Sequence, residues 1–182
     1  YKIYKFDRRH KVDLRDWDNV SSKLNRIQDI NVFIYCVGVG YFGDFSSLTK
    51  RQIGEMLYLN LESAIYLTHL VLPKMVKGGH LIYVASNSAR YEFPRNTVYG
   101  AAKAGLSHFA RTLWQEIKGN GFRVSVISPG TVNTKSFWSH GTDNRNACTP
   151  LEPSDIAKCV EFILQSGGNV LEVEILPNAK AN

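Results

Sequence analysis

The stretch SNSARYEFPRNTVYGAAK, residues 86–103, decides the fold of this chain. An apolar run at 81–85 comes directly before it and predicts a buried strand. A proline and an Asn-Thr pair inside the stretch predict that a helix starts there and runs over about 98–118. Tyr99 and Lys103 are four residues apart, so they lie on one face of that helix, one turn from each other.

Tyr99 and Lys103 together with Ser86 predict a site for proton transfer. A tyrosine phenol has an unperturbed pKa of about 10, and a nearby ammonium favours the phenolate and brings that pKa closer to neutrality. Ser86 ends the preceding strand, where its hydroxyl can hold a substrate oxygen. These three side chains suit proton transfer to a carbonyl oxygen or from the corresponding alcohol. The alternative is that the Tyr-x-x-x-Lys spacing is a surface pair, which is its more common meaning when it stands alone.

Strands and helices alternate along the chain. This pattern predicts an α/β fold, a Rossmann-like doubly wound parallel sheet with helices on both faces, in one domain over residues 1–182. The run 31–37 is nearly all apolar, which predicts a strand buried on both faces. The predicted strands are 2–7, 11–14, 31–37, 81–85, 122–127 and 170–176, and the predicted helices are 17–27, 50–77, 98–118 and 153–165.

Polar and glycine residues follow several of these strands. Ligands of parallel sheets bind outside the carboxyl ends of the strands, which share one edge. We therefore expect these residues to line one site. They are Asp7, Asp13, Gly38, Ser86 and the pair Pro129-Gly130.

A serine, a Tyr-x-x-x-Lys motif thirteen residues later and small residues around the lysine resemble the short-chain dehydrogenase/reductase family. The resemblance covers nearly all of the chain. It implies hydride transfer between NAD or NADP and a carbonyl or secondary alcohol, with Tyr99 as the acid or base. It further implies that Lys103 lowers the pKa of Tyr99, that Ser86 holds the substrate oxygen, and that Asn60, within a helix, holds a relay water.

The resemblance also implies a cofactor site. Asp13-Leu14 matches a pair that touches adenine, residues 35–38 (Tyr-Cys-Val-Gly) stand where the family has Asn-Asn-Ala-Gly, and residues 129–134 match a motif along the nicotinamide. The implied cofactor-binding residues are Asp7, Arg8, Asp13, Leu14, Cys36, Gly38, Tyr99, Lys103, Pro129, Gly130, Val132 and Thr134.

The preference between NAD and NADP stays open at this point. A carboxylate at the end of a strand, here Asp7, bonds the ribose hydroxyls and repels a 2′-phosphate, which favours NAD. Arg8 and Arg9 come next and can bind that phosphate. We prefer NAD on the strength of Asp7.

The chain departs from the family at its start. The family opens with a strand and a glycine-rich turn that holds the cofactor pyrophosphate at a helix N-terminus, and nothing before Asp7 contains that turn. We expect that about thirty residues, one strand-plus-helix unit, precede Tyr1 in the complete protein. The alternative is a scaffold or regulatory module that has lost cofactor binding.

Composition narrows the remaining function classes. The net charge is +6, but the basic residues are scattered and no nucleic-acid motif is present, so we expect no nucleic acid partner. No apolar run approaches the ~20 residues of a membrane span. Three scattered cysteines predict free thiols, no metal site and a reducing, cytoplasmic setting. We expect a small-molecule substrate under a lid at 135–150, and the family resemblance implies a homodimer or homotetramer.

Overall fold

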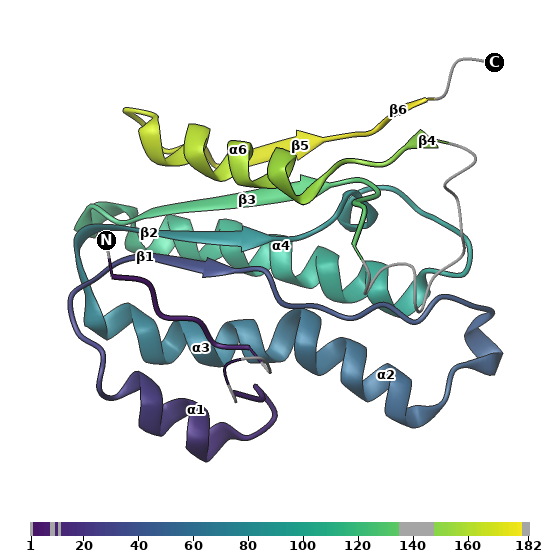
Figure 1. The fold of residues 1–182 in the computed structure, drawn as a ribbon, viewed down its shortest axis with the longest axis horizontal. Coiled ribbons are helices and arrows are strands. Elements are labelled where there is room, and N and C mark those ends of the chain that lie inside the picture. The colour runs from purple at the N-terminus through teal and green to yellow at the C-terminus, as the bar shows by residue number, and fades with distance from the viewer. Residues whose placement is uncertain (1, 8–9, 11, 135–147, 180–182) are drawn as a thin grey trace.

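A four-stranded parallel sheet forms the centre of the molecule (Figure 1). The computed structural model describes residues 2–7, 10, 12–134 and 148–179. The strand order is β1-β2-β3-β5, and every neighbouring pair is parallel. The strands are β1 (Ile30–Tyr35), β2 (Met75–Val84), β3 (Arg123–Pro129) and β5 (Glu172–Ile175).

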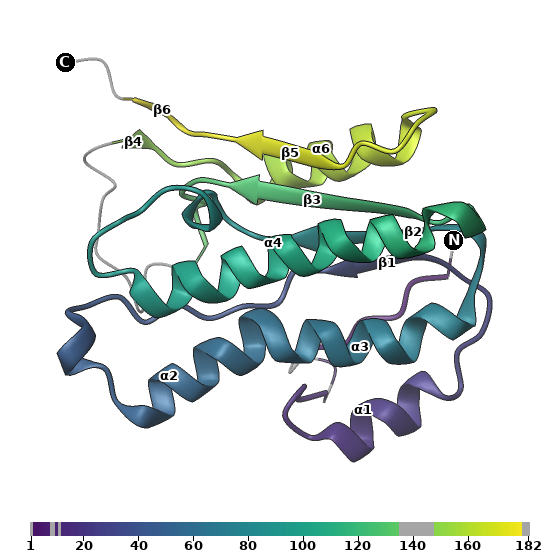
Figure 2. The ribbon, with the colours of Figure 1, turned by 180° about the vertical axis from the view of Figure 1, so that it is seen from behind.

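Helices cover both faces of this sheet, as the alternating pattern predicted. Figure 1 shows α6 in front of β3 and β5, and Figure 2 shows α4 on the opposite face. The larger apolar core lies under α1, α3 and α4, whereas a smaller one joins Ile163 of α6 to Ile82 and Ile127 of the sheet. The helices are α1 (Trp17–Leu24), α2 (Lys50–Leu57), α3 (Ser63–Val71), α4 (Thr97–Ile117) and α6 (Pro153–Gln165).

A short antiparallel pair completes the secondary structure. It joins β4 (Cys148–Thr149) to β6 (Asn178–Ala179). Most of the predicted lid falls on residues 135–147, which lie outside the described residues.

The two strands predicted at the beginning of the chain, 2–7 and 11–14, are wrong. The described residues there form a bend and a turn, in which the amides of His10 and Val12 bond the carbonyl of Asp7. An extended segment becomes a strand only when a neighbouring backbone satisfies its amides and carbonyls. Among the described residues no such neighbour lies beside this segment or along the outer edge of β1.

The prediction that residues 31–37 are buried on both faces of the sheet is also wrong. Val32 is 38% exposed and Ile34 is 44% exposed, whereas Tyr35 is 2% exposed. The face that carries Tyr35 packs on the larger core, while α6 covers only the far half of the other face.

The long helix predicted over 50–77 is shorter and has an internal irregularity. A π-helical turn, Tyr58–Glu62, joins α2 to α3. A 3-10 turn with Pro73 follows α3, because proline has no amide to continue the helix. β2 then begins at Met75, so Gly78 and Gly79 lie within this strand and do not end the helix.

None of the helices in the described ranges is both long enough and apolar enough to cross a membrane.

Candidate active site

The first turns of α4 bring together the three residues on which the sequence argument rests. Asn96 is the N-cap of α4, so Tyr99 lies in its first turn and Lys103 one turn later. Ser86 follows β2 and accepts a hydrogen bond from the amide of Ser88 (3.1 Å), and its side chain lies near enough to Tyr99 to lower the pKa of that phenol. The predicted meeting of these side chains at the carboxyl end of β2 is therefore seen.

The environment of Tyr99 differs from the prediction in one respect. Burial raises the pKa of its phenol, and the nearby Ser86 side chain opposes only part of that rise. The Lys103 amine lies 5.7 Å from the centroid of the Tyr99 ring. In the protein alone, desolvation thus outweighs the stabilisation of the phenolate that we expected from Lys103.

Lys103 is a buried lysine, with 4% of its surface exposed. Its amine donates a hydrogen bond to the carbonyl of Val84 (3.0 Å), the last residue of β2. Burial lowers the pKa of Lys103 to about 8, and nearby Cys36 opposes this effect. The amine is therefore fixed beside the sheet edge and titrates close to neutral pH.

Asn60 completes the predicted set from the π-helical turn, where it is fully buried. Its amide nitrogen donates to the carbonyls of Val39 (2.7 Å) and Met56 (2.8 Å). Its Oδ1 is buried and has no hydrogen-bond partner among the described residues. A buried amide oxygen of this kind is a place for a ligand or a water molecule.

Gly38 lies directly beside that oxygen. A Cβ atom at Gly38 would lie 2.4 Å from Asn60 Oδ1 and 3.3 Å from Lys103 Nζ. Only glycine permits the backbone to approach both groups so closely. The glycine predicted for the cofactor site therefore adjoins two of the predicted catalytic residues.

The turn that follows β1 also reaches Tyr99. The ring of Phe42 meets the ring of Tyr99 edge to face, with 5.5 Å between their centroids. This contact gives the Tyr99 phenol an apolar wall on one side.

The nicotinamide motif lies beyond the carboxyl end of β3. Pro129 is the last residue of that strand, and the amide of Gly130 donates to Ile175 (2.9 Å). A Cβ at Gly130 would lie 2.6 Å from Pro177, so this glycine allows two segments to meet. Val132 bridges to Leu151, and the amide of Thr134 bonds the carbonyl of Val132.

The residues predicted to bind the adenosine end of the cofactor lie in different surroundings. The carboxylate of Asp7 accepts hydrogen bonds from the amide and Nδ1 of His10 at 3.0 and 2.8 Å, so Asp7 lies in a bend and not at the end of a strand. Asp13 is partly exposed, whereas the side chain of Leu14 is buried in the core. Cys36 is exposed directly after β1, and Arg8 lies outside the described residues.

Three groups that shape this site were not predicted from the sequence. The carbonyls of Val39 and Val84 are held by Asn60 and Lys103, and backbone acceptors leave no signal in a sequence. Glu55 was also missed, although its spacing from Arg51 on a helix indicates an ion pair. Within the described residues, no group of three or more histidines, cysteines and carboxylates could hold a metal ion.

The sequence model of the short chain dehydrogenase family matches residues 8–145. A ketoacyl reductase, HetN, from a Nostoc strain is 32% identical over 66% of this chain and 44% of its own length. An uncharacterized oxidoreductase of Staphylococcus saprophyticus is 35% identical over 72% of this chain and 58% of its own length. The chain thus spans about half the length of these curated relatives.

Solved structures of two dehydrogenases show the same fold. An alcohol dehydrogenase of Thermococcus sibiricus, complexed with 5-hydroxy-NADP, superposes with a TM-score of 0.76 at 24% identity, over 90% of this chain and 70% of its own. The serine dehydrogenase of Escherichia coli gives 0.76 at 23% identity, over 90% and 73%. Together with the site geometry, these matches show that the chain belongs to the short-chain dehydrogenase family.

Proposed function

We propose that this chain carries the catalytic half of an oxidoreductase that transfers a hydride between NAD or NADP and a carbonyl or secondary alcohol. The observation that carries the proposal is the buried amine of Lys103, which is bonded to the end of β2 and lies 5.7 Å from the centroid of the Tyr99 ring, with Ser86 near the phenol. A surface Tyr-Lys pair has no reason to bury its amine at the end of a strand.

The site fits a nicotinamide cofactor on the residues present. Gly38 has no side chain that would block the approach of a cofactor. The Asn60 oxygen, which has no partner among the described residues, and the Lys103 amine lie beside this glycine. Lys103 would hold the nicotinamide ribose, and residues 129–134 would line the ring. The cofactor, when bound, supplies or accepts the hydride.

The protein's own residues handle the proton. In reduction, the Tyr99 hydroxyl donates its proton to the carbonyl oxygen, and the Ser86 hydroxyl holds that oxygen in line. The positive charge of Lys103 then stabilises the phenolate that remains on Tyr99. Oxidation of the alcohol follows the same path in reverse.

Asn60 would hold the water molecule through which Tyr99 regains its proton. Its unpaired Oδ1 can accept a hydrogen bond from a water molecule, and such a water can in turn bond the amine of Lys103. The two hydrogen bonds that Asn60 donates to Val39 and Met56 fix the direction of this oxygen.

The expected preference for NAD rests on the carboxylate of Asp7, although Asp7 lies in a bend and not at the end of a strand. Burial raises the pKa of the Cys36 thiol and the charge of Asp7 adds to this rise, so Asp7 is within electrostatic reach of the residue that follows β1. We expect NAD to be preferred. The relative from Haemophilus influenzae, 30% identical, is named a probable NADP-dependent dehydrogenase, which makes NADP the alternative. The ratio of kcat/KM for the two cofactors decides between them.

We also propose that the protein forms a homodimer or a homotetramer. Three large apolar side chains are exposed along α2 and α3: Leu57 (40%), Ile65 (36%) and Tyr66 (45%). A second copy can bury them. The molar mass in solution, measured by light scattering, tests this, and a monomer at micromolar concentration contradicts it.

The reaction type is tested by isotope transfer. The purified protein is incubated with a panel of ketones and aldehydes and with NADH or NADPH that carries deuterium at C4 of the nicotinamide. We expect deuterium on the former carbonyl carbon of the alcohol product. A folded sample that binds no dinucleotide and transfers no deuterium contradicts the proposal and favours the scaffold alternative.

A further inference from the structure

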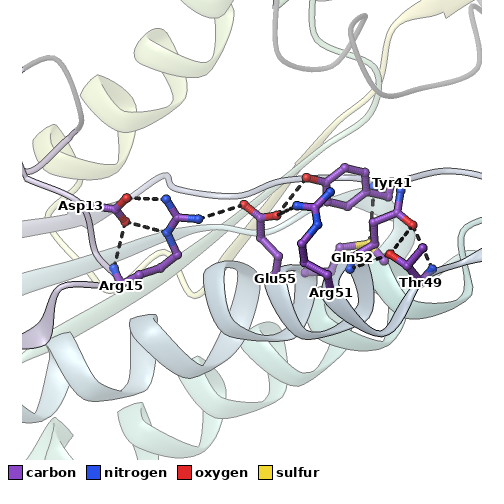
Figure 3. Close-up of polar contacts among 8 residues, drawn as sticks. Asp13, Arg15, Tyr41, Thr49, Arg51, Gln52 and Glu55 are labelled. Atoms are coloured by element: carbon purple, nitrogen blue, oxygen red, sulfur yellow. Dashed lines mark hydrogen bonds and ion pairs between the residues drawn. The ribbon is translucent and has the colours of Figure 1, made fainter.

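A chain of polar contacts connects the two loops that border the candidate cofactor site (Figure 3). One end is Asp13, in the turn before α1, and the other is Tyr41, in the turn after β1. Arg15 and Glu55 join them, and none of these four was assigned a role in catalysis. Because the four side chains come from three separate segments, their contacts fix how these segments lie relative to one another.

The first link orients the carboxylate of Asp13. The backbone amide and Nε of Arg15 both donate to Asp13 Oδ1, at 3.0 and 2.9 Å, and Nη2 of Arg15 donates to Oδ2 at 2.5 Å. Paired donors from a planar guanidinium fix the plane of a carboxylate as well as its position. Asp13 is therefore presented in one orientation before any ligand arrives.

The second link is Glu55, which is only 13% exposed. Its Oε2 accepts a hydrogen bond from the Tyr41 hydroxyl at 2.9 Å and pairs with Arg51 at 3.1 Å, while its Oε1 lies 3.6 Å from Arg15. A capping box between Thr49 and Gln52 fixes the N-terminus of the helix that carries Glu55. Glu55 therefore contacts both loops: the one before α1 through Arg15 and the one after β1 through Tyr41.

The two loops serve opposite ends of the proposed cofactor site. The turn after β1 contacts Asn60 through the carbonyl of Val39 and contacts Tyr99 through the ring of Phe42. The turn that carries Asp13 would meet the adenine. Because Glu55 contacts both loops, it can hold the two ends of the cofactor site at the spacing that a dinucleotide requires.

We propose that Arg15 and Glu55 are positioning residues: Arg15, supported by Glu55, orients Asp13 toward the adenine, and Glu55, through Tyr41, holds the turn beside Tyr99. This inference rests on the proposed function, because it names the residues that set the affinity and the alignment of its cofactor. Neither residue touches the reacting atoms.

Two variants separate the two links. Glu55→Gln keeps an acceptor for Tyr41 but loses the charge that faces Arg15, whereas Tyr41→Phe loses the hydroxyl that links Glu55 to the turn after β1. Glu116→Gln, at an exposed glutamate of α4, is the matched control. Binding of AMP and of nicotinamide mononucleotide is measured by calorimetry, and KM and kcat are measured with the dinucleotide.

We expect Glu55→Gln to weaken AMP binding and raise the dinucleotide KM about fivefold, the effect of one partly exposed ion pair, with kcat and mononucleotide binding within about twofold of the wild type. We expect Tyr41→Phe to lower kcat about threefold, the effect of one hydrogen bond, with AMP binding unchanged. Arg15→Gln, at a half-exposed position, should repeat the AMP defect even if Glu55→Gln fails to fold.

Some outcomes overturn the inference. These are a wild-type protein that does not bind AMP, variants of Glu55 and Arg15 that bind AMP as the wild type does, or a loss that is equal for AMP and for the mononucleotide. A wild-type protein that binds AMP and shows the variant pattern in binding, but has no turnover with any carbonyl, contradicts the proposed function and leaves the positioning role in place.

Discussion

At Gly38 the backbone passes directly against two side chains of the site. The position that a Cβ would take lies 2.4 Å from Asn60 Oδ1, below any normal contact distance. Asn60 cannot move away freely, because its amide nitrogen holds two backbone carbonyls. One methyl group at residue 38 therefore disturbs Asn60, and the amine of Lys103 lies 3.3 Å from the same point.

We predict that Gly38→Ala lowers kcat/KM on the order of 100-fold, the effect of misplacing catalytic groups by about 1 Å. It should also lower the free energy of unfolding by about 1–3 kcal/mol, because hydrogen bonds of a buried amide are lost. Steady-state kinetics measures kcat/KM, and urea unfolding measures the free energy of unfolding. Wild-type activity in this variant would show that Gly38 does not adjoin the working site.

Gly54→Ala is the matched control for the glycine substitution. Gly54 lies inside α2, and nothing lies within 4 Å of its Cβ position. Alanine is preferred to glycine in a helix, so this variant should gain about 0.5–1 kcal/mol of stability and keep its activity.

His80 makes the stability of the protein depend on pH. It is buried in β2 beside Ser125, and burial lowers its pKa from 6.5 to about 4, with Arg123 adding to the effect. Between these two values the unfolded chain binds a proton that the folded chain does not bind. The free energy of unfolding therefore falls as the pH is lowered from 6.5 toward 4.

We predict that His80 contributes a slope that approaches about 1.4 kcal/mol per pH unit in that window, the limit for one proton. Urea unfolding from pH 4 to 7 measures it. His80→Asn should reduce the slope by this contribution, and His108→Asn, at an exposed position of α4, should leave it as it is. Equal slopes for the wild type and His80→Asn would contradict this assignment.

The proximity of Ser86, Tyr99 and Lys103 was predictable from the sequence, because spacing and strand ends place them. A separation of four residues on a helix puts Tyr99 and Lys103 together, and the end of the strand before that helix puts Ser86 beside them. The direction of the Tyr99 pKa was not predictable. It depends on how much water the fold excludes, and a motif does not contain that information.

At the scale of elements, the helical region before β2 shows where a periodic pattern misleads. The pattern of apolar residues continues past the end of α3, but Pro73 ends the helix there and Met75 starts a strand. The π-helical turn that carries Asn60 was also not predicted, because the pattern of apolar residues does not show which carbonyl each backbone amide bonds.

The open edge of β1 makes a prediction about self-association. Val32 and Ile34 expose apolar side chains on the uncovered face of this edge strand, and no strand pairs with the outer side of β1 in the part of the chain that the structure describes. Exposed apolar edge strands favour pairing between molecules. Ile34→Lys should therefore reduce aggregation, measured by sedimentation velocity, with no loss of stability.

Phe45→Lys is the control for the edge substitution. Phe45 is 61% exposed and lies in a 3-10 turn away from the sheet. If both lysine variants change aggregation by the same amount, the edge of β1 is not its cause.

For the whole molecule, alternation of strands and helices was sufficient to predict a parallel sheet with helices on both faces. The sheet order follows from the same rules, since each crossover from β1 to β2 and from β2 to β3 carries a helix. The first segment was not predictable from its own residues. Its alternating pattern is typical of a strand, but a strand also needs a neighbouring backbone, and local sequence does not show whether one is present.

The length of the chain also bears on the whole protein. It matches about half of each curated relative, whereas Asn60, Ser86, Tyr99 and Lys103 all fall within residues 8–145, which the family model matches. The proposed proton-handling residues are thus all in this chain, and they can be tested in it directly.

The most direct test of this account is the rate of carbonyl reduction by Tyr99→Phe, compared with the wild type and with Tyr66→Phe, a control at an exposed tyrosine of α3. Loss of the proposed proton donor should lower kcat at least about 100-fold, while the dissociation constant for NADH or NADPH stays within about threefold. The Tyr66→Phe variant should match the wild type. A Tyr99→Phe protein that reduces the carbonyl at the wild-type rate would contradict the account.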